Sequence, residues 1–98
     1  GFNVYPSEIE DVLMTHVGVR VAAAIGVPDA RSGEAIRLFI VPHAGQTLDA
    51  SEVQHFLRAR LTAYKVPKHI EFREHLPTST VGKILRRELR AEVLAAGN

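Results

Sequence analysis

The sequence has no cysteine among its 98 residues. This absence excludes a disulfide framework and any thiolate metal site, so the stability of the fold must come from packing. The lack of cysteine also fits a reducing compartment, and we expect the protein to be cytoplasmic.

Long hydrophobic runs are absent as well. The most apolar stretch, residues 17–28, is interrupted by Gly18, Arg20 and Gly26 and is much shorter than the about 20 residues that span a membrane. We therefore expect no transmembrane segment.

Several kinds of site are excluded by patterns that the sequence lacks. Its five histidines have no histidine partner four residues away and no cysteine beside them, so we expect no metal site. The chain has no Walker A motif, because Pro77 stands where that motif needs glycine and Ile84 stands where it needs serine or threonine. No Gly-x-Ser-x-Gly pattern marks a hydrolase nucleophile. With only six aromatic residues, the chain lacks the stacking side chains of an RNA-binding sheet, and we expect no nucleic-acid partner.

Composition and charge indicate one folded domain with an uneven charge distribution. Hydrophobic residues make up 46% and charged residues 23% of the chain, as in ordinary globular domains. Residues 1–50 carry three arginines against six acids, a net charge of −3, whereas residues 51–98 carry nine basic side chains against five acids, a net charge of +4. The C-terminal half should therefore face an anion. The basic side chains that could bind phosphates, or simply form a solvated surface, are Arg58, Arg60, Lys65, Lys68, Arg86, Arg87 and Arg90.

The first half of the chain predicts a helix followed by a β-hairpin. Pro6 suits the first turn of a helix over residues 7–16, where apolar side chains recur at helical spacing. Residues 19–27 are rich in alanine and β-branched side chains and predict a strand. Residues 34–42 predict a second strand, and the short turn between the two makes an antiparallel pair.

The second half predicts a helix, a third strand and a third helix. Asp49 and Glu52 have the spacing of a capping box at the start of a helix. Residues 69–73 alternate as a strand does, and apolar residues among charges predict a helix from about Lys83 to Ala95. The order α-β-β-α-β-α gives a single α+β domain, a small three-stranded sheet covered by helices. The residues expected in its core are Ile9, Leu13, Ile25, Ile36, Leu38, Ile40, Phe56, Leu57, Ile70, Phe72 and Leu89.

The most informative stretch for chemistry runs from residue 76 to residue 87. Pro77 fixes the entry of a short hydroxyl-rich loop, and Gly82 permits a backbone conformation that other residues resist. Lys83 follows at the predicted start of a helix. A cation presented there suits the stabilisation of charge that develops on a phosphoryl or carboxyl group. The alternative is an ordinary solvated lysine beside a glycine.

Four blocks of sequence resemble the C-terminal domain of adenylate-forming enzymes. They are GFNVYPSEIE at the start, GVPD with SGEAI in the middle, YKVP at residues 64–67, and LP leading to GKILRR at residues 82–87. That superfamily includes acyl-CoA synthetases, peptide-synthetase adenylation domains and firefly luciferase. The likeness is closest to bacterial long-chain fatty acid CoA ligases. Since it covers essentially the whole chain, which begins at Gly1 without Met, residues 1–98 are expected to be one C-terminal domain of a larger ligase.

The resemblance implies a two-step reaction and two faces of this domain. Such enzymes join a carboxylate to ATP, giving acyl-adenylate and pyrophosphate, and then transfer the acyl group to coenzyme A with release of AMP. The domain is a mobile lid that delivers the lysine matching Lys83 to the first step. After a rotation it presents the face with Gly1, Phe2 and Asn3 to the thiol tunnel, and Arg58 matches a residue that holds a CoA phosphate.

The resemblance also implies what lies outside this chain. The sites for ATP, magnesium and the acyl chain belong mainly to an N-terminal domain, which is the lid's first partner. The fragment alone is therefore expected to be inactive.

Two alternatives to a long-chain fatty acid CoA ligase stay open. The acid that the enzyme activates could be a medium-chain or aryl acid, or the chain could be a stand-alone basic interaction module. An exposed Lys83 would be a target for an acetyltransferase. The full-length enzyme could associate peripherally with the inner face of the membrane.

Overall fold

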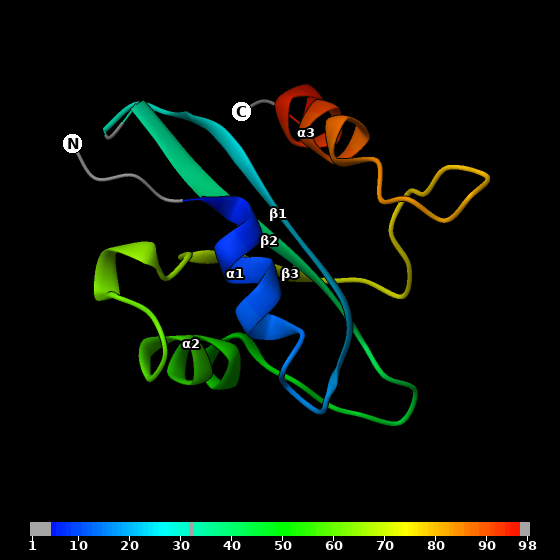
Figure 1. Cartoon of the computed structure of the whole chain (residues 1–98). Coiled ribbons are helices and arrows are strands. Elements are labelled where there is room, and N and C mark those ends of the chain that lie inside the picture. Colours follow the sequence, from blue (N-terminus) through cyan, green and yellow to red (C-terminus); the bar gives the residue numbers. More distant parts are fainter. Residues whose placement is uncertain (1–4, 32, 97–98) are drawn as a thin grey trace.

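The computed structural model describes residues 5–31 and 33–96, and Figure 1 shows its α+β architecture. Within these ranges the predicted order α-β-β-α-β-α is confirmed, with one short 3-10 turn, η1, added before the last strand. The elements are α1 (Pro6–Leu13), β1 (Val19–Asp29), β2 (Gly33–Pro42), α2 (Ala50–Arg58), η1 (Ala63–Lys65), β3 (His69–Phe72) and α3 (Arg86–Ala95). No helix in the described ranges is long and apolar enough to cross a membrane.

The sheet has the strand order β1-β2-β3, with β2 in the centre. β1 and β2 form the antiparallel hairpin that the sequence predicts. β2 and β3 run parallel, with Arg37 opposite His69 and Ile40 opposite Phe72. A parallel pair needs a crossover connection, and α2 with η1 supplies it.

Both faces of the sheet are covered, because side chains of successive residues in a strand point to opposite faces. On β2, Leu38 and Ile40 pack in one apolar cluster with residues of α1 and α2. The neighbouring Phe39 and Val41 pack in a second cluster, which contains Leu89 of α3. In Figure 1, α3 accordingly stands apart from α1 and α2. The result is a three-layer domain with helices on both sides of the sheet.

Local signals in the sequence set the starts of two helices. Pro6 occupies the first turn of α1, as predicted. The capping box is present at α2: the Glu52 N–H donates to the Asp49 carboxylate at 2.8 Å, and the Asp49 N–H donates to the Glu52 carboxylate at 3.3 Å. Two boundaries were predicted wrongly. α1 ends at Leu13 and gives way to turns before Gly18, and α3 begins at Arg86 rather than Lys83.

Most of the side chains predicted for the core are buried, and the others are only partly buried. Seven of the expected side chains are buried, namely Ile9, Leu13, Ile25, Leu38, Ile40, Leu57 and Leu89. Ile36, Ile70 and Phe72 are only half-buried: Ile36 lies in the first half of β2, and the other two lie on the edge strand β3. Phe56 is also half-buried, with the Arg60 guanidinium 3.6 Å from its ring centroid. Phe39 is fully buried, although it was not among the side chains expected in the core.

The difference between the two phenylalanines can be measured. Phe39→Ala should lower the free energy of unfolding by about 3–5 kcal/mol, because it empties space in a fully buried cluster. Phe56→Ala should cost clearly less, since that ring is already partly exposed. Urea denaturation of the 98-residue chain, followed by circular dichroism, provides both values. Equal losses for the two variants would contradict the burial described here.

Candidate functional site

Residues 77–85 form a small hairpin outside the main sheet, which we call the Lys83 hairpin. Its two arms meet in an antiparallel bridge between Thr78 and Ile84. At its base, the Leu85 N–H donates to the Pro77 carbonyl oxygen at 2.9 Å. Pro77 therefore marks the start of the hairpin, and α3 begins directly after its end.

The turn of the hairpin depends on Gly82. The Gly82 N–H donates to the Ser79 carbonyl oxygen at 2.9 Å, and the Ser79 N–H donates to the Lys83 carbonyl oxygen at 2.8 Å. Gly82 has φ +84°, in the left-handed region that side-chain-bearing residues resist. Hairpins with short loops commonly place glycine in this conformation. Gly82 thus closes the turn immediately before the lysine.

Lys83 lies in the extended second arm of the hairpin, three residues before α3. The expected helix start at Lys83 is wrong because its backbone groups serve the hairpin: its N–H donates to the Ser79 hydroxyl oxygen at 3.2 Å. The side chain is exposed, and its ammonium makes no hydrogen bond or ion pair with any residue in the described ranges. The structure therefore presents a solvent-exposed cation on the short, hydrogen-bonded Lys83 hairpin.

A partly buried carboxylate, that of Glu10, lies beside the base of the Lys83 hairpin. Glu10 of α1 accepts hydrogen bonds from Arg86 Nε at 2.8 Å and Arg86 Nη2 at 2.6 Å. The same carboxylate accepts a bond from the Ala24 N–H of β1 at 2.7 Å, and its side chain is only 12% exposed. The hydrogen bonds to Glu10 raise the pKa of Arg86, against the opposing effect of its partial burial. Sequence reasoning missed this role of Glu10, although the residue ends the GFNVYPSEIE block of the family resemblance.

Arg58, the one described residue that was expected on the thiol-transfer face, does not lie at the hairpin. Arg58 is exposed at the last position of α2, and Figure 1 shows α2 well apart from the Lys83 hairpin. Gly1, Phe2 and Asn3 lie outside the described residues. The structure thus brings together Pro77, Gly82 and Lys83 and leaves Arg58 elsewhere on the molecule.

The YKVP segment beyond α2 is tied to α1. The Lys65 ammonium donates to both oxygens of the Glu8 carboxylate, at 3.0 and 3.2 Å. This hydrogen bonding raises the pKa of Lys65. Lys65 is thereby half-buried and paired, unlike Lys83.

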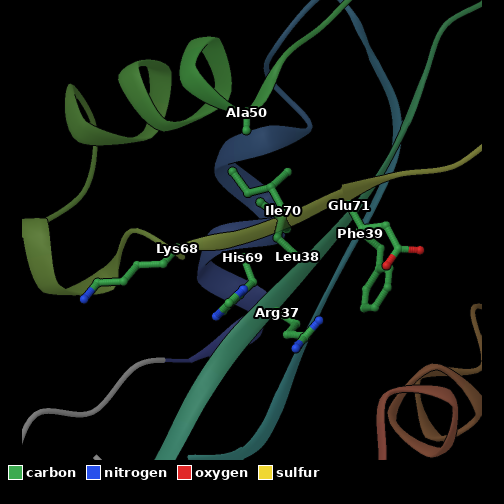
Figure 2. A pocket seen from close by; sticks show the side chains of 8 residues that line it. All are labelled: Arg37, Leu38, Phe39, Ala50, Lys68, His69, Ile70 and Glu71. Carbon is green, nitrogen blue, oxygen red and sulfur yellow. The ribbon is translucent and has the colours of Figure 1, made fainter. Parts of the chain in front are cut away.

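A shallow cleft of about 300 Å³ opens along β2 and β3, near the start of α2 (Figure 2). Its walls include Arg37, Lys68, His69 and Glu71. The Arg37 Nε atom is buried without a hydrogen-bond partner among the described residues. The Lys83 hairpin does not line this cleft, so Lys83 and the cleft lie on different parts of the surface.

The described residues also contain no group of three or more His, Asp or Glu side chains that could hold a metal ion.

Comparison with known proteins assigns the domain to a family. The family described as AMP-binding enzyme C-terminal domain matches residues 8–83. A long-chain-fatty-acid–CoA ligase of Salmonella typhimurium is 60% identical over 92 residues, which are 94% of this chain and 16% of that protein. A feruloyl-CoA synthase of Amycolatopsis sp. is 48% identical over 90 residues, 92% of this chain and 18% of that protein.

A solved structure supports the same assignment. The acyl-CoA synthetase of Brucella canis superposes with a TM-score of 0.91 at 29% identity, over 100% of this chain and 19% of that one. The chain therefore spans less than a fifth of the length of these relatives. The fold, the sequence blocks and the match over residues 8–83 all agree, and the chain belongs to the family of AMP-binding enzyme C-terminal domains.

Proposed function

We propose that this domain is the C-terminal lid of a long-chain fatty acid CoA ligase, with Lys83 as the catalytic cation of adenylate formation. The observation that carries the proposal is the exposed Lys83 ammonium, which pairs with none of the described residues, on a hairpin closed by Gly82 where the sequence matches the family's GKILRR block. The 60% identity to a long-chain-fatty-acid–CoA ligase supports this choice of acid. The 48% identity to a feruloyl-CoA synthase keeps an aryl acid as the second candidate, because the acid pocket lies outside this chain.

In the first half-reaction, a carboxylate oxygen of the acid attacks the α-phosphorus of ATP, and pyrophosphate leaves. The anionic carboxylate and phosphate repel each other as they approach. A Lys83 ammonium placed between them would offset that repulsion and stabilise the charge that develops in the transition state. For two unit charges about 4 Å apart at an effective dielectric constant near 20, the attraction contributes roughly 4 kcal/mol.

In the second half-reaction, the CoA thiol attacks the acyl carbonyl carbon and AMP leaves. We assign this step to a different side of the lid, with Gly1, Phe2 and Asn3 beside the pantetheine arm and Arg58 at a CoA phosphate. The exposed position of Arg58, apart from the Lys83 hairpin, supports this division. A lid of this kind needs a rotation between the two steps.

The remaining machinery belongs to an N-terminal domain that precedes the lid in the full-length enzyme. ATP and the acyl chain would bind there. Magnesium is assigned there as well, since the described residues of this chain offer no cluster of three potential ligands. We place the enzyme in the cytoplasm, with peripheral contact to the inner face of the membrane where its fatty acid substrate collects.

Replacing the lysine should separate the two half-reactions. In the full-length enzyme, Lys83→Ala should slow pyrophosphate release by up to about a thousandfold if most of its roughly 4 kcal/mol appears only in the transition state. Formation of acyl-CoA from supplied acyl-adenylate should stay largely intact. Lys68→Ala is the matched control, because Lys68 is also an exposed lysine and lies off the hairpin.

Thermal melting verifies that each variant is folded. Equal losses in both half-reactions would refute the assignment of Lys83 to the first step alone. Normal rates in both steps would remove Lys83 from the active site, and a loss as large in Lys68→Ala would show that the effect is not specific.

The exposure of Lys83 also predicts regulation by acetylation. Its exposed ammonium is accessible to an acetyltransferase, and acetylation would remove the charge that adenylate formation requires. Lys65 should react less, because its ammonium is held by Glu8. Mass spectrometry of the full-length enzyme, incubated with acetyltransferase and acetyl donor, would locate the modification. Modification confined to Lys65 and Lys68, or full activity after complete acetylation of Lys83, would contradict this prediction.

A further inference from the structure

The Glu10 carboxylate joins three segments that are distant in the sequence. It comes from α1, accepts a hydrogen bond from the Ala24 N–H of β1, and accepts two from Arg86, which lies 76 residues further along the chain. A carboxylate that is nearly buried must be compensated, and here it has three donors at 2.6–2.8 Å. The two nitrogens of Arg86 bind the two oxygens of Glu10, the paired geometry that fixes orientation as well as charge.

The Ala24 bond attaches this carboxylate to the sheet. β1 is an edge strand, so amides on its outer side have no strand to pair with. The Ala24 N–H, on that outer side, is satisfied by Glu10 instead. The position of the Glu10 carboxylate is thus determined by the strand backbone as well as by α1.

Arg86 lies directly after the base of the Lys83 hairpin. It is the first residue of α3 and follows Leu85, whose N–H closes the hairpin against Pro77. The start of α3 has no side-chain cap of its own. Among the described residues, the pair with Glu10 is a polar contact that attaches this end of α3, which directly follows the hairpin, to α1.

We propose that Glu10 and Arg86 are positioning residues for adenylate formation: they hold the base of the hairpin so that Lys83 reaches the reacting groups in one fixed geometry. This inference rests on the proposed role of Lys83 and goes beyond it, because neither side chain needs to touch the substrate. A displacement of about 1 Å at a reacting group can cost on the order of a hundredfold in rate. Loss of the pair should therefore act on the rate of the first half-reaction.

A double-mutant cycle in the full-length enzyme tests the proposal. Arg86→Gln and Glu10→Gln should each lower kcat for pyrophosphate release by about 10- to 100-fold, with little change in KM for ATP. In the Lys83→Ala background, the same changes should lower the remaining rate less than about threefold, because residues that act through one group are not additive. Arg87→Gln is the matched control, as Arg87 is the exposed neighbour of Arg86.

The cycle distinguishes positioning from simple support of the fold. A structural role would lower the rate equally in the Lys83 and Lys83→Ala backgrounds, and would lower both half-reactions together; either result overturns the proposal. So would unchanged kcat in both Gln variants. If a Gln variant does not fold, Arg86→Lys replaces it, since a lysine keeps the charge but loses the paired hydrogen bonds and should still reduce kcat. If Lys83→Ala itself has no effect, the proposed function fails instead.

Discussion

Burial of β2 on both faces is the constraint around which the domain is arranged. Its four consecutive residues 38–41 are all buried, so protein must cover both sides of the sheet. α1 and α2 supply one layer and α3 the other. The chain must therefore pass from β3, at one edge of the sheet, to α3 on the face behind it. Leu76 anchors this connection in the second cluster, and the Lys83 hairpin follows within it.

Helix α1 contacts two of the sequence blocks that carry the family resemblance. Glu8 pairs with Lys65 in the YKVP segment, and Glu10 pairs with Arg86 at the base of the Lys83 hairpin. Residues two positions apart lie about 200° apart around a helix, so the two carboxylates point to different sides of α1. One short helix can thus set the position of both segments relative to the sheet.

Local patterns allowed much of the fold to be predicted, whereas contacts between distant residues decided the rest. The capping box at Asp49 and the proline at the start of α1 act within a few residues and were predicted correctly. The start of α3 was placed three residues too early, because Ile84 has helical spacing yet bridges to Thr78. The continuous apolar run of β2 does not reveal that Phe39 is the largest of its fully buried side chains. For the site, Lys83 and Gly82 stand out in the sequence, but Glu10 acts across 76 residues and looks like any acid in a first helix.

The central claim is that the domain uses the Lys83 hairpin and the Arg58 side in turn. Hydrogen–deuterium exchange of the full-length enzyme tests it most directly, with one sample holding ATP and an unreactive fatty acid analogue and another holding a stable acyl-adenylate analogue with CoA. The account predicts that amides of residues 78–84 are protected in the first sample. In the second sample, protection should move to the end of α2 and the residues that follow it. Protection of the same segments in both samples would contradict the claim.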